Sequence, residues 1–349
     1  MKKVLLGMSG GVDSSVSAIL LKEQGYDVIG MTLELFGGTC CNTDAIVGAK
    51  QICNSIGIPH ITYNLKEEFQ CKVINNFIDE YSNQRTPNPC IECNKYMKFG
   101  AMYEKAKELG CDYIATGHYA KMEYSDEYGK YVLRKAKNLS KDQSYVLYNM
   151  PKQLLGKVLF PLGDFESKED VRKIAKEHNL SVASKPDSED ICFIPDGNYK
   201  KFLEQNSSIV PKEGNIVNRK GEVLGRHTGL YNYTIGQRKG LGISYKVPLF
   251  VIGFNKERNE VIVGEQQELY RKEMKVNEVN LLLMDKIERT LDVTVKIRYA
   301  SKPAEAIINQ TEAGNIQVIF KEPQRGITPG QSAVFYIGDV VVGGGKIQD

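Results

Sequence analysis

The sequence Ser9-Gly10-Gly11-Val12-Asp13-Ser14-Ser15 decides how the first part of the chain folds. An apolar run over residues 4–8 precedes it and predicts a strand, and residues 16–22 have helical character before Gly25. A strand, a glycine turn and the start of a helix therefore follow one another. This arrangement directs backbone N–H groups and a helix N-terminus towards one point, where an anion such as a phosphate can bind.

The side chains of this loop point to a nucleotide. Gly10 and Gly11 let the backbone approach a phosphate closely, because neither residue carries a Cβ atom. The hydroxyl groups of Ser9 and Ser14 are further donors. The Asp13 carboxylate is unusual in a site for anions alone and indicates a divalent cation beside the phosphates. The alternative is a turn that only packs a helix on a sheet. The loop has neither the ending of a Walker loop nor the three-glycine spacing of a dinucleotide fold.

Ser-Gly-Gly-x-Asp-Ser after an N-terminal strand resembles the phosphate loop of the PP-loop ATP pyrophosphatases. In that family the loop holds the outer two phosphates of ATP while a substrate oxygen attacks the α-phosphorus. Pyrophosphate leaves and the substrate becomes adenylated. The resemblance implies an N-terminal α/β domain with a parallel sheet, with ATP and Mg²⁺ as cofactors.

Length and composition narrow the class of protein. A chain of 349 residues predicts two or three domains, and 42% apolar residues are typical of a globular protein. No apolar run is long enough to span a bilayer, and the short Met1-Lys2-Lys3 before the first strand fits no signal peptide. The eight cysteines are then expected to be reduced thiols. We therefore expect a cytoplasmic protein without a membrane partner.

Strand and helix patterns alternate up to about Gly117 and predict a parallel sheet with helices on both faces. Ligands of such sheets bind beyond the carboxyl ends of the strands. The loop over residues 9–15 and the turn Thr116–His118 are therefore expected to face one pocket. Helical patterns are found at residues 43–56, 67–81, 95–109 and, interrupted by prolines, 141–178.

The pattern changes after Pro211, where short alternating strands and hairpin turns dominate. We expect an α/β protein with three domains: a PP-loop domain with a helical extension (1–205), a small, mostly β central domain (206–270) and a C-terminal β-barrel (271–349). Net charge is only +3, but residues 206–245 contain six Lys or Arg against two Glu. This run is either a solvated face or a surface for a polyanion, and Arg238 and Lys239 in its glycine-rich part are candidate phosphate contacts.

The second informative stretch is Thr86-Pro87-Asn88-Pro89-Cys90-Ile91-Glu92-Cys93-Asn94. Its prolines keep the backbone extended, and its Cys-x-x-Cys opens a helix whose N-terminus stabilises a thiolate. A lone Cys-x-x-Cys fits half a zinc site, a redox pair, two cluster ligands or two buried thiols. Farther on, Cys192 lies in a strand-like run before a Pro-Asp-Gly turn. Cys40 and Cys41 receive no role, and the cysteines of the helical segments are interpreted as core residues: Cys53, Cys71 and Cys111.

An ordered set of motifs makes the resemblance specific. Besides the phosphate loop, the chain contains Thr-Pro-Asn-Pro-x-x-x-Cys-Asn-Lys, Ala-Thr-Gly-His-Tyr-Ala, Lys-Asp-Gln-Ser-Tyr, Ile-Cys-Phe-Ile, Tyr-Thr-Ile-Gly-Gln-Arg-Lys-Gly-Leu-Gly and Arg-Tyr. Together they cover the whole chain and resemble the tRNA-specific 2-thiouridylases. These enzymes replace the C2 oxygen of the wobble uridine of tRNA with sulfur.

The resemblance also implies roles for individual residues. The implied ATP-binding residues are Gly7, Met8, Ser9, Gly10, Gly11, Val12, Asp13, Ser14, Leu33 and Gly117. Those implied to contact tRNA are Asn88, Pro89, Cys90, His118, Lys141, Asp142, Gln143, Arg298, Tyr299 and Gln331. Cys93 is implied to be the catalytic thiol and Cys192 the cysteine that carries a persulfide, so the catalytic set is Cys93, Cys192, Cys90 and Asp13.

Cys90 departs from the family pattern, in which Asp is common at this position. Cys90, Cys93 and Cys192 provide three thiolates, enough to hold three irons of a 4Fe–4S cluster and leave one iron open for the transferred sulfide. The alternative is a persulfide relay without a metal. Both routes are consistent with the sequence, and the number of thiol ligands favours the cluster.

The sequence thus predicts ATP-dependent 2-thiolation of a tRNA wobble uridine. The expected partners are the anticodon arm of tRNA and either a sulfur-donor protein or inorganic sulfide. One alternative is another PP-loop enzyme, such as an amide-forming synthetase acting on a small molecule, which needs neither thiols nor an RNA surface. The other is a non-enzymatic nucleotide- or iron–sulfur-binding module, which leaves Asp13 and Cys192 unexplained.

Overall fold

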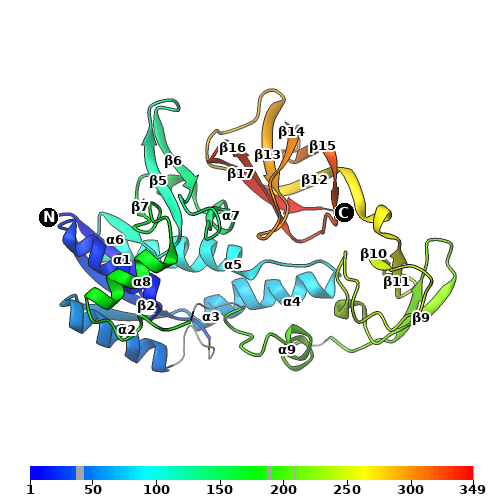
Figure 1. Ribbon diagram of the computed structural model, residues 1–349, viewed down its shortest axis with the longest axis horizontal. Coiled ribbons are helices and arrows are strands. Elements are labelled where there is room, and N and C mark those ends of the chain that lie inside the picture. Colours follow the sequence, from blue (N-terminus) through cyan, green and yellow to red (C-terminus); the bar gives the residue numbers. More distant parts are fainter. Residues whose placement is uncertain (37–42, 187–190, 208, 349) are drawn as a thin grey trace.

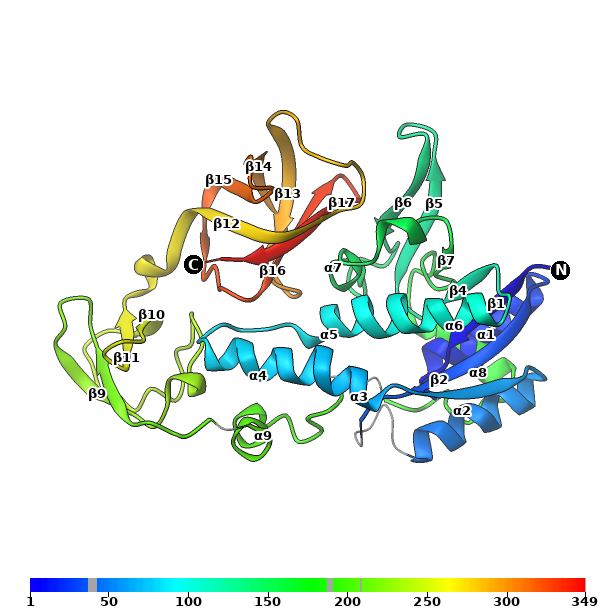
Figure 2. The same ribbon diagram turned by 180° about the vertical axis from the view of Figure 1, so that it is seen from behind.

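Three β-sheets organise the computed structural model, which describes residues 1–36, 43–186, 191–207 and 209–348 (Figure 1). A five-stranded sheet and a four-stranded sheet lie at opposite ends of the molecule. Helical segments run between these ends, and a β-barrel packs on one side of them, as the view from behind also shows (Figure 2). Cys40 and Cys41 lie outside the described residues. Within the described part of the chain, no helix is long and apolar enough to cross a membrane.

The N-terminal sheet is entirely parallel, as the alternating pattern predicts. Its strands are, in spatial order, β3 (His60–Asn64), β2 (Asp27–Glu34), β1 (Lys3–Gly7), β4 (Tyr113–Ala115) and β7 (Val158–Leu159). The chain builds outward from β1 to β3 and then crosses to the other side of β1 to form β4. The carboxyl ends of β1 and β4 therefore lie at the switch point of the topology, where such folds bind their ligands.

Alternate residues of β1 enter two separate cores, because successive side chains of a strand point to opposite faces. Val4 and Leu6 pack with one group of helices: α1 (Val12–Glu23), α2 (Thr43–Ile56) and α8 (Lys168–Glu177). Leu5 packs on the other face with η2 (Cys93–Ala101), a π-helix, and α6 (Met102–Glu108). The sheet is thus covered on both faces.

Two long helical segments lead away from this sheet towards the rest of the molecule. Each contains a stretch of π-helix between α-helical parts. One consists of α3 (Lys66–Phe69), η1 (Gln70–Ile74) and α4 (Asn75–Ser82), and the other of α5 (Pro89–Glu92), η2 and α6. Their apolar side chains form a third core with α9 (Tyr199–Asn206) and the segment around Phe193.

After β4 the chain forms a hairpin of β5 (Ala120–Ser125) and β6 (Lys130–Lys135). Residues 141–166 then differ from the helical pattern expected for residues 141–178. They contain only one turn of helix in α7 (Ser144–Leu147), a 3₁₀ turn η3 (Lys152–Leu154) and the edge strand β7. Pro151 and Pro161 explain the difference, because proline removes a donor that helices need. Only α8 forms as expected, and Ser167 caps it by accepting from the Asp170 N–H.

The central domain contains β8 (Gly214–Val217), β9 (Val223–His227), β10 (Phe250–Asn255) and β11 (Glu260–Gly264) in the order β10-β11-β8-β9. The predicted turn at residues 218–221 joins β8 to β9. Between β9 and β10 the chain forms the 3₁₀ turn η4 (Leu230–Asn232) and a glycine-rich loop.

Six strands of the C-terminal domain close into the expected β-barrel. They are β12 (Tyr270–Leu281), β15 (Ile316–Arg325), β14 (Ala304–Gln310), β13 (Leu291–Lys296), β16 (Ser332–Ile337) and β17 (Val340–Ile347), preceded by the 3₁₀ turn η5 (Gln266–Leu269). Pairing of β12 with β17 completes the ring. Closure leaves the barrel with no open edge of its own.

The barrel and the N-terminal domain share a core, so they are packed firmly together. Leu282, Val334 and Tyr336 of the barrel belong to the same buried cluster as Leu5 and Met102. The β6 strand also pairs with β17 through Arg134 and Val340. Three tyrosine and serine contacts add hydrogen bonds across this junction: Tyr145 to the Ser332 carbonyl (2.8 Å), Tyr148 with the Ser332 hydroxyl (3.0 Å) and Ser144 with Tyr336 (3.3 Å).

The aromatic core beside α4 provides a test of the fold. Phe77 is 1% exposed, and its ring lies 4.9 Å from that of Tyr81, 5.4 Å from that of Phe193 and 6.1 Å from that of Phe202. We expect Phe77→Ala to lower the free energy of unfolding by about 3–5 kcal/mol, because it leaves a cavity among these rings. Urea unfolding of the full chain measures this change. Leu139→Ala, at a side chain that is 71% exposed, is the control, and equal effects of the two substitutions would contradict the assignment of this core.

Candidate nucleotide and thiol site

The loop after β1 is shaped for a ligand at the start of α1. Gly10 has a φ of +71°, and a Cβ at this position would lie 3.0 Å from the carbonyl oxygen of Ala45. Gly11 is the N-cap residue of α1 and provides no side-chain cap. The N-terminal N–H groups of the twelve-residue helix therefore point, without a side-chain cap, towards the carboxyl edge of the sheet.

The serine side chains hold this loop together from within. The Ser9 N–H donates to the Ser14 hydroxyl oxygen at 3.2 Å, and the two hydroxyl oxygens are also 3.2 Å apart. Ser15 donates to the Gly11 carbonyl at 2.8 Å, and Ser17 donates to the Asp13 carbonyl at 2.8 Å. The four hydroxyl groups thus hold the loop and the first turns of α1, with Ser9 exposed and Ser14 buried.

A lysine that sequence reasoning missed contacts the acidic residue of the loop. The Lys168 Nζ atom lies 2.6 Å from both carboxylate oxygens of Asp13, and the Tyr119 hydroxyl donates to one of them at 2.9 Å. The Lys168 side chain is only 8% exposed. Its position is the one signal in the sequence, since Lys168 follows the Ser167 cap in the first turn of a helix. A cation there is unfavourable with respect to the helix dipole, which indicates that it has a negatively charged partner elsewhere. A second missed lysine, Lys185, donates to the Gly10 carbonyl at 3.1 Å.

Gly117 brings the turn after β4 against the phosphate loop. A Cβ at Gly117 would lie 2.9 Å from the backbone carbon of Asp13 and 2.9 Å from the Ser14 nitrogen. The two segments therefore meet, as expected from the parallel sheet. Of the remaining residues implied for ATP, Gly7 ends β1, Met8 and Val12 are buried beside it, and Leu33 lies half-buried in the neighbouring strand β2.

His118 is buried and neutral. Its Nδ1 atom is 2.7 Å from the Thr116 hydroxyl, and its Nε2 atom is 3.4 Å from the Lys98 ammonium. Burial and, to a lesser extent, Lys98 hold the pKa of His118 well below its usual value of 6.5. The ring is 8% exposed, so it supports the turn after β4 rather than presenting a charge to a polyanion.

The Lys-Asp-Gln segment folds back on the protein. The buried Asp142 carboxylate accepts from the N–H groups of Ala136 and Ser144 at 3.0 and 3.2 Å and from the Ser144 hydroxyl at 2.8 Å. Gln143 accepts from the Tyr119 N–H at 2.9 Å. These two side chains therefore shape the segment between β6 and α7, and Lys141 beside them is half-buried.

The cysteines implied in sulfur transfer differ in their surroundings. Cys90 is exposed at the start of α5, where Asn88 caps the helix by accepting from the Cys90 N–H at 3.2 Å. Cys93 and Cys192 are half-buried, and both pack against the aromatic core that contains Phe77 and Phe193. Tertiary packing thus places two cysteines that are far apart in the sequence against the same core. Cys192 lies in a turn, not in the strand-like run expected there.

The three cysteines do not gather as a metal site in this structure. Among the described residues, no three His, Cys, Asp or Glu side chains lie together in a way that could hold a metal ion. The hypothesis of a cluster on Cys90, Cys93 and Cys192 therefore gains no support from the geometry.

The remaining cysteines also differ from one another. Burial raises the pKa of Cys53 to about 11, which keeps this core thiol protonated and unreactive. Cys71 is exposed, so its assignment to the core was wrong, because this position faces solvent from η1.

Barrel residues named by the resemblance lie near the cysteine-bearing segment. Tyr299 is half-exposed, and its pKa is raised by burial and by the nearby Asp142 and Cys90. Arg298 donates to the Gly326 carbonyl at 2.7 Å and to the Ile235 carbonyl at 3.3 Å, so it links the barrel to the glycine-rich loop of the central domain.

Other implied contacts lie on the surface or on the backbone of the cysteine-bearing segment. Gln331 donates to the Thr86 carbonyl at 2.8 Å. Pro89 is buried at the first position of α5. Arg238 and Lys239 are both exposed in the glycine-rich loop.

Comparison with family models assigns the three parts of the chain. Residues 2–196 match a model described as the tRNA methyl transferase HUP domain, residues 200–265 its PRC-barrel domain, and residues 271–347 an aminomethyltransferase β-barrel domain. The descriptions of these family models mention methyl transfer, whereas the curated relatives are named for tRNA thiolation.

The curated relatives match over nearly their whole length. A tRNA-specific 2-thiouridylase MnmA of Clostridioides difficile is 48% identical, over 99% of this chain and 98% of that protein. The enzymes of the same name from Acetivibrio thermocellus and Halothermothrix orenii are 48% and 47% identical, over 99% and 100% of this chain and 99% of each relative.

Solved structures are more distant. A 4-thiouridine synthetase in complex with RNA and ATP matches at 19% identity over 58% of this chain and 50% of that chain, with a TM-score of 0.37, which is too low to bear on the assignment. The full-length identity to the curated relatives is decisive, and the chain belongs to the family of tRNA-specific 2-thiouridylases.

Proposed function

We propose that this protein is an ATP-dependent tRNA-uridine 2-sulfurtransferase that acts on the wobble uridine. The observation that carries the proposal is the 48% identity over 99% of the chain to a tRNA-specific 2-thiouridylase. The uncapped start of α1 at the switch point of the parallel sheet agrees with it. An amide-forming synthetase would need neither the half-buried cysteines of the aromatic core nor the two β-domains.

The first half-reaction is adenylation. The C2 oxygen of the uridine attacks the α-phosphorus of ATP, and pyrophosphate leaves towards the loop of Ser9, Gly10 and Gly11. Mg²⁺ fits beside the phosphates, because one carboxylate together with phosphate oxygens commonly holds this ion. Asp13 is the residue that would hold it, and Lys168 then adds positive charge for the phosphates.

The second half-reaction is sulfur transfer through Cys93 and Cys192. A sulfur donor loads Cys192 as a persulfide, and the Cys93 thiolate attacks its inner sulfur. A disulfide forms between Cys93 and Cys192, and hydrosulfide leaves. Hydrosulfide then attacks C2 of the adenylated uridine, and AMP departs with the original oxygen. An external thiol reductant restores the two cysteines. The packing of both residues against one aromatic core supports this relay.

The tRNA surface is proposed to include the exposed loop of the central domain. Arg238 and Lys239 lie there among glycines, and the described structure leaves both side chains at the surface. We further propose domain boundaries at residues 205/206 and 270/271, so that this loop belongs to a separate unit from the cysteines. The bases of an anticodon loop are single-stranded and can be splayed apart, so several domains can contact them at the same time.

The pair of Asp13 and Lys168 provides the first test of this function. Asp13→Ala and Lys168→Met are each expected to reduce AMP and pyrophosphate formation by about 10²-fold or more, since both remove charge stabilisation at the phosphates. The double substitution should cost little more than either one alone, because the two side chains contact each other. Binding of tRNA should persist in filter-binding assays, and near-normal adenylation by Asp13→Ala would overturn the assignment.

The basic loop is tested by the salt dependence of tRNA binding. Replacing Arg238 and Lys239 with glutamine should weaken binding and flatten the plot of log K against log salt by roughly 1.4–1.8, the effect of about two counterions. Replacing Lys173 and Lys176 of α8 with glutamine is the control with the same change of charge. If both double variants have the wild-type slope, the loop is only a solvated surface.

The cysteines are tested by thiolation and metal analysis. Cys93→Ser and Cys192→Ser should each eliminate 2-thiouridine formation from a persulfide donor, because the relay needs both thiols to release hydrosulfide. Cys90→Ala should lower the rate without altering the metal content of anaerobically purified protein. A parallel loss of iron, sulfide and activity in Cys90→Ala would instead establish a cluster on the three thiolates.

A further inference from the structure

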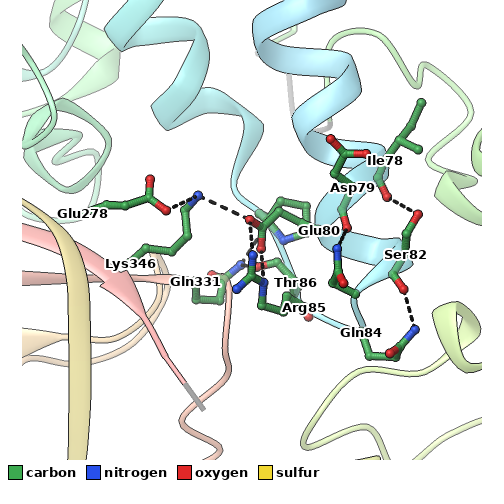
Figure 3. A network of polar contacts seen from close by, with 12 residues as sticks. Ile78, Asp79, Glu80, Ser82, Gln84, Arg85, Thr86, Glu278, Gln331 and Lys346 are labelled. Carbon is green, nitrogen blue, oxygen red and sulfur yellow. Dashed lines mark hydrogen bonds and ion pairs between the residues drawn. The ribbon is translucent and has the colours of Figure 1, made fainter. Parts of the chain in front are cut away.

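A turn of the barrel binds the backbone of the segment that leads to the two cysteines of α5 and η2 (Figure 3). The Thr86 N–H donates to the Pro329 carbonyl at 2.9 Å. The Gln331 side-chain amide donates to the Thr86 carbonyl at 2.8 Å and to the Pro87 carbonyl at 3.3 Å. The backbone N–H and C=O groups of Thr86 are therefore both bound by residues from the C-terminal domain.

Gly330 makes this contact possible. Its φ is +87°, and a Cβ there would lie 2.8 Å from the Thr86 nitrogen, 2.8 Å from the Arg85 Cβ and 3.0 Å from an oxygen of Glu80. A side chain would therefore push the two domains apart in addition to straining the backbone. The close approach of the turn to residues 85–86 depends on this glycine.

A buried carboxylate reinforces the same junction. Glu80 is 4% exposed and contacts the Arg85 Nε atom at 2.8 Å and the Lys346 ammonium of β17 at 3.3 Å. Lys346 also contacts Glu278 of β12 at 3.2 Å (Figure 3). Glu80 thus joins α4, the start of the segment and two barrel strands. A buried charge with two cationic partners holds its neighbours in one arrangement, since separation would leave it unpaired.

The anchor at Thr86 and Pro87 is only a few residues from the thiols. Pro87 and Pro89 restrict the backbone between them, and Asn88 caps α5, in which Cys90 is the second residue. Burial raises the pKa of the Glu92 carboxyl group, and the positive charge of Lys346 opposes this effect. The barrel therefore contacts the cysteine-bearing segment before Cys90, and the charge of Lys346 also acts on Glu92 between the two cysteines.

We propose that Gln331 and Gly330 are positioning residues that hold the Cys90–Cys93 segment in place for sulfur transfer. The family resemblance implies a tRNA contact for Gln331, whereas here its amide nitrogen is bound to the backbone of residues 86 and 87. The C-terminal domain thereby acts on the thiols through the backbone of the segment that carries them. The effect of Gln331 and Gly330 on the rate of sulfur transfer rests on the proposed function. Their effect on the position of the Cys90–Cys93 segment does not depend on it.

The test uses the full chain without tRNA and measures iodoacetamide labelling of Cys93, located by fragment mass spectrometry. Cys93 is half-buried, so loosening of its segment should expose it. We expect Gln331→Leu, Gln331→Glu and Gly330→Ala to accelerate labelling about fivefold, the effect of losing one hydrogen bond of ordinary strength. Gln331→Glu keeps the size of the side chain but replaces its N–H donors with oxygens that face two carbonyl groups.

Gly314→Ala is the matched control for Gly330→Ala. Gly314 lies in another barrel turn with a φ of +79°, and a Cβ there would meet nothing within 4 Å. Both substitutions strain the backbone similarly, but only Gly330→Ala disturbs residues 85–86. We therefore expect wild-type labelling of Cys93 in Gly314→Ala. Equal labelling of Cys93 in the wild type and all four variants would overturn the proposal.

Kinetics separate a positioning role from a direct contact with tRNA. In Gln331→Leu we expect kcat for 2-thiouridine formation to fall about tenfold while the KM for tRNA and the single-turnover rate of pyrophosphate formation stay within about twofold. A raised KM for tRNA together with unchanged Cys93 labelling would overturn the positioning role and establish a tRNA contact. If the wild type formed no 2-thiouridine, the proposed function would fail, whereas the labelling result would still decide the role of Gln331.

Discussion

The contact between Gly117 and the backbone of Asp13 and Ser14 is the constraint on which the nucleotide site depends. The carboxyl ends of β1 and β4 lie beside each other, and there is no room for a Cβ between the two turns. The start of α1 is thereby fixed against the sheet without a side-chain cap, which leaves its dipole and N–H groups directed outward. Any larger residue at position 117 would have to move the loop.

The charge at this site is arranged before any nucleotide arrives. Asp13 would repel phosphate by itself, but the Lys168 ammonium contacts both of its oxygens and the Tyr119 hydroxyl donates to one of them. The pair is therefore close to neutral as a unit, and binding of a cation at Asp13 would release a positive charge for the phosphates. This arrangement ties α8 to the loop, although the two lie 155 residues apart.

The cysteines Cys93 and Cys192 are held by an aromatic core, whereas the nucleotide site is held by the charged pair of Asp13 and Lys168. Cys93 and Cys192 border the rings of Phe77 and Phe193, whereas Cys90 remains exposed at the beginning of α5. The barrel adds a second constraint through Gln331 and the buried Glu80. The aromatic core and the barrel both contact the same segment of chain, from α4 to η2.

The sequence by itself determined the local structures and the family. The phosphate loop, α2 at Thr43–Ile56, the cap of α8 at Ser167 and the alternating strands of the barrel follow from patterns within a few residues, because caps, turns and side-chain periodicity are local properties. The ordered motifs were equally sufficient to predict the full-length relatives. Residues 141–178 were the main failure: Pro151 and Pro161 interrupt the helical pattern, and only α7 and α8 are α-helical there.

Only the tertiary structure decided which distant residues meet. Lys168 gave one weak local signal, and nothing in the sequence indicated that Gln331 binds the backbone of Thr86. The association of Cys93 with Cys192 was implied only by the family resemblance, and their shared aromatic core comes from the tertiary structure. The buried state of His118 and Asp142 likewise depends on neighbours from other elements. Sequence periodicity records whether a side chain faces a core, but the partner in that core is set by how helices, sheet and barrel pack together.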